Sequence, residues 1–579
     1  MKRQQLLLLL ILLMSSCFIQ AWNYDGRYGW PVQKAPKEII VCDKGSTLAE
    51  AMLIESLSGL AAQTVNEGKF DKMIWIDVNS NISYEKIYTK TLDALNIKQT
   101  KKMKLWELVD LLKHKKVIKG YVLYKLDEPR QNAYASYPNA DYSSNVATVY
   151  AGLMKGILID ESLETEARKY GLKCLKDARN ESLEECFEHN KRKLNNYSAL
   201  SVPPTVSNLR DYAIAHKLML YADKKELIDK VLAWVKPISP ILGWGCGDEY
   251  DFTSLIAQWG HVNTATNWCW NLPLISSVTE KVELKKAKEI SLEEINFNDT
   301  VSFHSFVMSD GDNMQWTIGD FLENPAYLGN QDRDNIGLSW TLCPIELSVV
   351  SPFTWNSLAE VQKNNFSYLE YGGGYQYPDL FAVNRSNRIE LLREFARRVN
   401  YHLRKMDIKI FGFICRDVAS KAAQEAFQIY AEEMEDITGM LAVQYFPYEL
   451  DGEIYWKTNK KGIDVPVVTS RYSIWDEVNP LRPRAGTPEF VSSIINREVT
   501  ASHNKGENML TWTIVHAWSD FNKSSKLVQS PSIGLNPVKT SQNLLIDKIK
   551  VVSVNELLWR IRMKYRPEQT KAIILHQRN

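Results

Sequence analysis

The sequence predicts an α/β protein in which a C-terminal TIM-like (β/α)8 barrel, regular or distorted, follows N-terminal α/β accessory domains. Apolar strand-like runs alternate with amphipathic helical segments along most of the chain. In the C-terminal half this alternation becomes regular. A length of 579 residues exceeds what one ordinary core holds, which favours several domains. We therefore expect the accessory region at 22–290 and the barrel-like domain at 291–579.

The accessory region begins with an alternating pattern typical of a parallel sheet. "KEIIVCD" (37–43), "KMIWIDV" (72–78) and "VIKGYVLYKL" (117–126) read as strands, and residues 47–63 have apolar side chains at helical spacing. Residues 241–274 differ, because glycines and tryptophans surround Asp248 and Glu249. We expect a loop there, either a wall of a cleft or a packed interdomain connection.

The barrel prediction depends on apolar runs that follow one another in the C-terminal half. The eight runs are 302–309, 335–342, 366–371, 408–415, 439–446, 464–470, 508–515 and 549–554. Their number, spread over about 270 residues, fits a (β/α)8 barrel. Pro466 interrupts the sixth run, and a large doubly wound sheet would give a similar pattern.

Helix signals lie between these runs. Residues 389–403 carry one apolar face at a spacing of 3.6 residues. Ser420 is the expected cap of the next helix, which Gly439 would end. Thr487 followed by Pro488 predicts the start of another helix.

The composition is that of a soluble globular protein, with 45% hydrophobic and 24% charged residues. The net charge of +1 gives no reason to expect a nucleic-acid partner. The 17 Trp and 27 Tyr residues suit cores, interfaces and sugar-binding clefts alike.

The first 21 residues predict an exported protein. Lys2 and Arg3 precede an apolar run from Leu6 to Met14, which is too short to span a membrane. "LMSSC" resembles a lipobox, which would make Cys17 the lipidated first residue of the mature chain; cleavage after Ala21 would instead release a soluble protein. We expect a periplasmic protein, an outer-membrane or cell-surface lipoprotein, or a secreted protein, with membrane contact only through Cys17.

Cysteine and histidine spacing predicts neither a disulfide framework nor a zinc site. The seven other cysteines form no C-x-x-C pair. Cys174 and Cys186 are close enough in sequence to pair, but we expect free thiols. No H-E-x-x-H motif occurs. No cofactor is expected, and a cation at Asp310 and Asp312 is possible but not favoured.

Polar and aromatic residues follow the carboxyl ends of the predicted strands, where barrel enzymes carry their active sites. The candidate acids are Asp310, Asp312, Glu346 and Asp417. The candidate substrate-binding residues are Asn313, Trp316, Gly374, Tyr375, Tyr377, Asp379, Arg416, Tyr445, Trp475, His516 and Trp518. Structural interpretations stay open: "SDGDN" is also a good turn sequence, Asp379 could cap a turn, and His516 could be a structural histidine.

The stretch "YLEYGGGYQYPDLF" (368–381) sets three glycines beside a tyrosine cluster. Glycine lets a backbone turn sharply and approach a ligand closely, whereas a tight turn packed by aromatic residues is the structural alternative. Gly372, Gly374, Tyr375, Tyr377 and Pro378 match G-x-G-Y-x-Y-P, so the chain resembles the GxGYxYP family of bacterial glycoside hydrolases. This resemblance implies exported carbohydrate processing and accessory domains ahead of the motif-bearing domain. It assigns no catalytic residues.

We therefore expect an exported glycoside hydrolase that acts on an oligo- or polysaccharide. Glycosidic hydrolysis ordinarily uses two carboxyl groups, one protonated and one ionised. Asp310 and Asp417 are the first choice, because Asp310 follows an apolar run and Arg416 would favour the ionised form of Asp417. The alternatives are a non-catalytic glycan-binding lipoprotein and a metal-dependent carbohydrate esterase or deacetylase.

Overall fold

The computed structural model of the chain describes residues 29–578, apart from 79–80, 128–131, 133, 137–138 and 477–481. The predicted signal peptide and Cys17 lie outside the described residues. Within the described ranges, no helix has the length and apolar character needed to cross a membrane.

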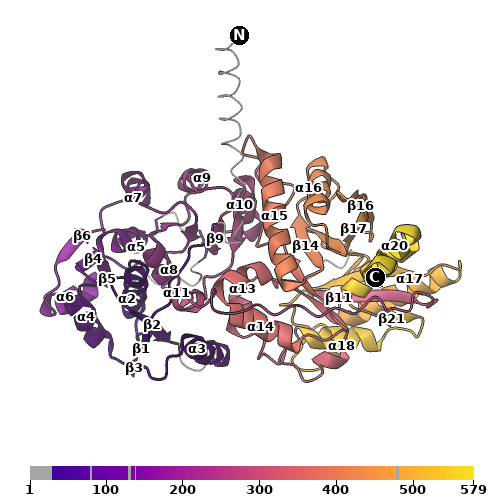
Figure 1. The fold of residues 1–579 in the computed structure, drawn as a ribbon, viewed down its shortest axis with the longest axis horizontal. Coiled ribbons are helices and arrows are strands. Elements are labelled where there is room, and N and C mark those ends of the chain that lie inside the picture. The colour runs from indigo at the N-terminus through magenta and orange to yellow at the C-terminus, as the bar shows by residue number, and fades with distance from the viewer. Residues whose placement is uncertain are drawn as a thin grey trace, which may run out of the picture.

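The N-terminal half contains three small parallel sheets (Figure 1). The first has the order β2-β1-β3, the second β5-β4-β6 and the third β10-β9-β7-β8. Their strands are β1 (Glu38–Asp43), β2 (Lys72–Asp77), β3 (Lys101–Lys102), β4 (Gly120–Tyr124), β5 (Gly156–Asp160), β6 (Cys174–Asp177), β7 (Ala199–Ser201), β8 (Met219–Tyr221), β9 (Pro240–Gly243) and β10 (Val262–Thr264). The α/β alternation expected for this half is therefore present.

Helices separate these strands along the chain. They are α2 (Leu48–Asn66), α3 (Ile82–Leu95), α4 (Leu105–His114), α5 (Ser143–Met154), α6 (Glu164–Lys169), α7 (Leu183–Asn190), α8 (Arg210–His216), α9 (Lys225–Trp234), α10 (Glu249–Gln258) and α11 (Leu272–Ser276). Helix α2 is buried on all sides from Ala51 to Val65, and this stretch includes polar residues such as Glu55 and Gln63. Its Gln63 donates to the carbonyl oxygens of Gly152 (2.8 Å) and Ile214 (2.9 Å), so α2 joins the three N-terminal sheets.

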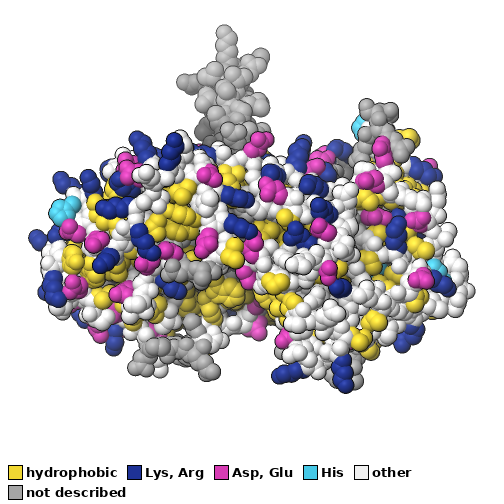
Figure 2. Space-filling view, turned by 90° about the horizontal axis from the view of Figure 1, so that it is seen from below, with side chains coloured by type: hydrophobic (Ala, Val, Ile, Leu, Met, Phe, Trp, Pro, Cys, Tyr) yellow, Lys and Arg dark blue, Asp and Glu magenta, His cyan; other side chains and the backbone are white. Residues whose placement is uncertain are grey.

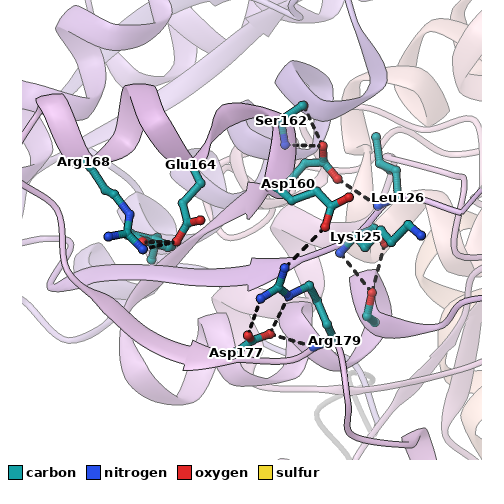
Figure 3. A network of polar contacts seen from close by, with 11 residues as sticks. Lys125, Leu126, Asp160, Ser162, Glu164, Arg168, Asp177 and Arg179 are labelled. Atoms are coloured by element: carbon teal, nitrogen blue, oxygen red, sulfur yellow. Dashed lines mark hydrogen bonds and ion pairs between the residues drawn. The ribbon is translucent and has the colours of Figure 1, made fainter.

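At the carboxyl edge of the second sheet, acidic side chains form hydrogen bonds and ion pairs with residues of the adjoining loops (Figure 3). Asp160 accepts the Leu126 N–H at 2.8 Å and the Ser162 hydroxyl at 2.6 Å. Asp177 binds Arg179 through two nitrogens, at 2.9 and 2.6 Å. Since each of these carboxylates is satisfied locally, the network stabilises the loops of this sheet.

The prediction of a loop at 241–274 is wrong. This segment contains the strands β9 and β10 of the third sheet, the helix α10 and the start of α11. Its apolar residues are spaced closely enough to bury short elements: Leu242, Phe252, Ile256 and Val262 are all buried. Of the glycines that favoured a loop, Gly243 ends β9, and Gly245, Gly247 and Gly260 lie between the elements.

The C-terminal half forms one long, curled sheet with the order β16-β17-β15-β14-β13-β12-β11-β20-β18-β19, and β21 pairs with β11. The strands are β11 (Ser302–Met308), β12 (Leu338–Leu342), β13 (Tyr368–Tyr371), β14 (Ile410–Cys415), β15 (Gly439–Gln444), β16 (Ile454–Thr458), β17 (Asp464–Thr469), β18 (Tyr472–Ile474), β19 (Ala485–Gly486), β20 (Leu510–Val515) and β21 (Ile549–Val551). Each of the eight predicted runs contributes a strand.

The pairing nevertheless differs from that of a closed eight-stranded barrel. The seventh run, β20, pairs directly with β11 along Phe303–Met308, and the eighth, β21, reaches only Ser302–His304. Strands β17 and β18 pair with opposite ends of the sheet, on β15 and β20, and only Ser470 and Arg471 separate them in sequence. The sheet is therefore curled, but its strand order is not that of a TIM barrel.

The helices of this half are α12 (Met314–Gly319), α13 (Pro344–Val350), α14 (Pro352–Val361), α15 (Arg388–Met406), α16 (Lys421–Glu433), α17 (Pro488–His503), α18 (Leu535–Asn543), α19 (Val554–Tyr565) and α20 (Pro567–Arg578). Helix α15 confirms the periodic segment, and Ser420 and Thr487 cap α16 and α17 as predicted. Gly439 was the wrong end for α16, because that helix stops at Glu433 and Gly439 opens β15.

Helices α10, α13 and α15 lie near the junction of the two halves (Figure 1). Charged side chains of both signs are interspersed over the face shown in Figure 2, without a broad field of one sign. The seven cysteines of the described chain are free, with Cys174 exposed and Cys186 buried.

Candidate functional site

The loop after β11 places Asp310 and Asp312 at the carboxyl edge of the curled sheet. Asp310 has φ = +65°, a left-handed conformation that costs an L residue about 1–2 kcal/mol. Gly311 is required beside it, because an added Cβ would lie 1.5 Å from the Thr341 carbonyl oxygen. The Gly311 N–H donates to the Thr341 hydroxyl at 2.9 Å, and the Ser309 hydroxyl donates to the Asp310 carboxylate. The loop is thus strained yet held in place, a combination common at functional sites.

A third carboxyl group comes from the N-terminal half. Glu249 is the first residue of α10, whose cap Asp248 accepts the Tyr250 N–H at 2.8 Å. Burial raises the pKa of Glu249 to about 7, with further contributions from the negative charges of Asp310 and Asp248. At neutral pH Glu249 therefore exists in both protonation states.

Asp312 is the most buried acid of this group, with 4% of its surface exposed. Burial raises its pKa well above the usual range, and the charges of Asp310 and Glu249 raise it further. A hydrogen bond with the Tyr375 hydroxyl opposes this shift. The charge of Asp310 therefore acts on both Glu249 and Asp312, which places the three carboxyl groups in one region although they come from the two halves of the chain.

The triple-glycine loop after β13 joins the two halves of the chain. All three glycines have positive φ: 77° at Gly372, 67° at Gly373 and 107° at Gly374. Tyr375 and Asn263 of β10 exchange backbone hydrogen bonds at 2.8 and 2.9 Å. A Cβ on Gly374 would lie 3.1 Å from the Asn263 carbonyl oxygen. The glycines therefore allow close contact between two parts of the protein, which is nearer to the structural alternative than to direct ligand approach.

A narrow pocket separates this loop from the acids. Its enclosed volume is about 10 Å³, close to what a single water molecule requires. Its walls include Glu249, Asp312, Tyr371, Tyr375 and Tyr377. A sugar ring is too large for this pocket and would have to lie outside it, where Glu249 and Asp310 are partly exposed.

Aromatic rings surround the acids on the side of β15 and β18. The Trp475 ring stacks on His516 (centroids 3.6 Å apart, planes 4° apart) and on Tyr448 (4.6 Å, 22°). Tyr448 continues to Tyr445 at 5.7 Å, and Tyr445 to Tyr377 at 5.9 Å. Burial raises the pKa of Tyr448, and nearby negative charges, including those of Glu249 and Asp310, raise it further. The predicted Tyr377, Tyr445, Trp475 and His516 thus form one continuous wall beside the acid group.

Asp417 stands apart from these acids. Its side chain is exposed, and its carboxylate accepts the Ala419 N–H at 3.0 Å. Asp379 accepts the backbone N–H groups of Arg416 (3.1 Å) and Asp417 (2.9 Å), so it organises this loop. The Arg416 guanidinium lies 3.3 Å from the centre of the Tyr250 ring. Arg416 therefore holds α10 through a cation–π contact rather than orienting Asp417.

Glu346 lies behind the glycine loop, fully buried in the first turn of α13. Its Oε1 is 3.1 Å from the position of a Cβ on Gly374. Burial raises its pKa to about 7. The neighbouring Glu370 accepts the N–H groups of Ile345 (2.9 Å) and Gly373 (3.2 Å). Glu370 thus holds the glycine loop, whereas the Glu346 side chain is buried beside it without a hydrogen-bond partner among the described residues and is not among those that line the pocket.

Of the remaining candidates, Asn313 and Trp316 have structural contacts, and Trp518 is exposed on the surface. Asn313 caps α12 by accepting the Trp316 N–H at 3.3 Å. Trp316 is only 4% exposed, and Trp518 packs on it with ring centres 4.7 Å apart. Trp518 itself is 40% exposed. Of the two rings, Trp518 is the one that a ligand could reach.

The structure thus brings Asp310, Asp312, Gly374, Tyr375 and Tyr377 together. The sequence analysis missed Glu249, Tyr371 and Tyr448 as members of this group. Glu249 stands in the segment that the sequence analysis left open as a wall of a cleft, and it does line the pocket. Within the described part of the chain, no three His, Cys, Asp or Glu side chains are grouped so that they could hold a metal ion.

Comparison with known families covers most of the chain. Residues 300–558 match the GxGYxYP putative glycoside hydrolase C-terminal domain. Residues 196–277 match the GxGYxYP third domain, and residues 118–194 the GxGYxYP_N second domain. The comparison with curated proteins gave no match.

A solved structure shares the fold. The crystal structure of a putative hydrolase from Bacteroides thetaiotaomicron VPI-5482 superposes with a TM-score of 0.74 at 21% identity, over 92% of this chain and 96% of that one. At this identity the similarity speaks for the fold alone.

Proposed function

This chain belongs to the GxGYxYP family, whose C-terminal domain is described as a putative glycoside hydrolase, and we propose that it hydrolyses glycosidic bonds at the junction of its two halves. The family description implies a carbohydrate substrate. The observation that carries the proposal is the convergence of Glu249, Asp310 and Asp312 beside an aromatic wall.

The three carboxyl groups suit the two roles that glycoside hydrolysis needs, one protonated acid and one ionised base or nucleophile. We assign the acid to Glu249, because its pKa of about 7 keeps a proton available at neutral pH. Asp310 is the ionised partner, since it is less buried than Asp312 and accepts the Ser309 hydroxyl. This assignment replaces the first-choice pair of Asp310 and Asp417.

Asp312 would have a positioning role rather than a catalytic one. It is buried, and burial favours its protonated form. Its hydrogen bond with Tyr375 links it to the loop that meets Asn263. We assign it the positioning of the other two carboxyl groups, with the proton it retains limiting the negative charge at the site.

The test is hydrolysis of a panel of nitrophenyl glycosides and polysaccharides by the full-length protein. We expect activity on at least one of them, and a loss of about 10²- to 10⁴-fold in kcat for Glu249→Gln and for Asp310→Asn. Glu568→Gln, a change at an 87% exposed side chain on α20, is the matched control. Full activity in either site variant would refute the assignment. Glycan binding without hydrolysis would favour the non-catalytic glycan-binding lipoprotein, and activity abolished by a chelator would favour the esterase or deacetylase.

Export is part of the same proposal and rests on the sequence of residues 1–21. We propose lipidation at Cys17, with release after Ala21 as the alternative. Cell fractionation with radiolabelled palmitate tests this, because Cys17→Ala should remove both the label and the membrane association. A wild-type protein that carries no label and stays in the soluble exported fraction would exclude the anchor.

A further inference from the structure

Two exposed tryptophan rings are attached to the acid loop and the helix that follows it. Among the tryptophans of the described chain, only Trp268 (56% exposed) and Trp518 (40%) have exposed side chains. The others are buried or partly buried. Large apolar rings held in water mark binding surfaces when they are also fixed in position.

Trp268 is fixed to the helix that follows the acids. Its backbone N–H donates to Gln315 Oε1 at 2.7 Å, and Gln315 is only 5% exposed. The Gln315 N–H in turn donates to the Ala265 carbonyl oxygen at 3.0 Å. The neighbouring Asn267 donates to the Tyr134 hydroxyl at 2.6 Å. The backbone under the exposed ring is therefore firmly held.

Trp518 is fixed to the acid loop itself. The preceding Ala517 donates its N–H to the Ser309 hydroxyl at 3.3 Å, and that hydroxyl donates to Asp310. Below the ring lies Trp316, the residue after Gln315. Both exposed tryptophans are thus attached to residues 309–316, the segment that carries Asp310 and Asp312.

We propose that Trp268 and Trp518 are sugar-binding platforms beside the acid group, and that the substrate is an oligosaccharide chain longer than one sugar unit. This inference rests on the proposed function. A pyranose ring has a face of C–H groups that covers an indole ring, while its hydroxyl groups remain in water. One unit would lie over the acids and neighbouring units over the two indoles. Trp268 belongs to the third N-terminal domain, so that domain would help select the substrate.

The experiment measures binding of labelled full-length protein to an array of oligo- and polysaccharides, together with hydrolysis of a nitrophenyl monoglycoside. We expect Trp268→Ala and Trp518→Ala each to weaken binding to the recognised oligosaccharides by about tenfold. Monoglycoside turnover should fall by a smaller factor than oligosaccharide binding, because a single sugar unit over the acids does not reach the indoles. Trp268→Phe should restore most of the binding, because it keeps a flat apolar face.

Tyr565→Ala is the control, since Tyr565 is 45% exposed and lines a depression with Phe303 and Leu510, at the starts of β11 and β20. Binding by Trp268→Ala and Trp518→Ala equal to that of the control would overturn the proposal, as would an equal loss of monoglycoside turnover. A wild-type protein that binds no glycan also overturns it. Tryptophan-dependent binding with no hydrolysis of any glycan would leave the platforms intact and reject the hydrolase.

Discussion

Replacing Glu249 by Gln should make the protein more stable at alkaline pH while it removes activity. Burial and the charges of Asp310 and Asp248 raise the pKa of this carboxyl from 4.5 to about 7. The folded protein therefore holds a proton that the unfolded chain releases above pH 4.5, and folding stability falls as the pH rises from 4.5 to 7. Each pKa unit corresponds to about 1.4 kcal/mol, so the loss reaches about 3 kcal/mol above pH 7. The amide of the variant has no charge to bury and avoids this loss.

The assay is the apparent Tm of the wild type and of Glu249→Gln between pH 4 and pH 8.5. We expect equal values near pH 4, a growing advantage for the variant above pH 4.5, and a constant advantage above about pH 7. Glu568→Gln should show no such trend, because its side chain is exposed. A variant that is less stable than the wild type at pH 8, or a difference that does not depend on pH, would refute the argument for a buried, charge-repelled acid.

Three further predictions concern the loops around the site. Gly374→Ala should lower the unfolding free energy by about 1–3 kcal/mol, because the new Cβ meets backbone at 3.1 Å and φ is +107°. Gly462→Ala, with φ = +75° and open space around it, should lower the free energy less when both variants are measured by thermal unfolding. Equal losses would contradict a packing role for Gly374. Asp379→Ala should expose the 416–419 loop to limited proteolysis, since two backbone N–H groups lose their acceptor; an unchanged cleavage pattern would count against it. Glu370→Ala should speed hydrogen exchange at the Gly373 amide, and protection equal to the wild type would show that the carboxylate does not hold the loop.

Sequence periodicity predicted the strands of the curled sheet well but not their closure. The eight runs differ from their surroundings in apolar content, which a sequence displays directly. The pairing with β11 is instead divided between two distant strands, because β20 pairs along Phe303–Met308 and β21 only with Ser302–His304. The order of strands is set by such contacts between distant segments, which no local pattern records.

The candidate site was predicted only in part, because some of its residues are brought together by contacts between distant segments. Asp310 and Asp312 follow a strand end, so the position rule for parallel sheets located them. Glu249 lies on α10 in the N-terminal half, and contacts between distant segments bring it near, among them the backbone pairing of Tyr375 with Asn263 and the packing of Arg416 on Tyr250. Asp417 also follows a strand end, yet its side chain is exposed because Asp379 holds the backbone of that loop. Position along a strand predicts the edge of the sheet, whereas the direction of a side chain depends on its hydrogen-bonded neighbours.

The pair of backbone hydrogen bonds between Asn263 and Tyr375 also affects which fragments of the chain can be active. A fragment beginning near residue 300 would keep the signature glycines and both aspartates, yet it would lack α10, and the tyrosine-bearing turn would lose its β10 neighbour. Such a fragment could fold and still be inert. The third domain and the C-terminal domain would therefore form one functional unit. Exchanging only one of them between related proteins should impair hydrolysis more than glycan binding.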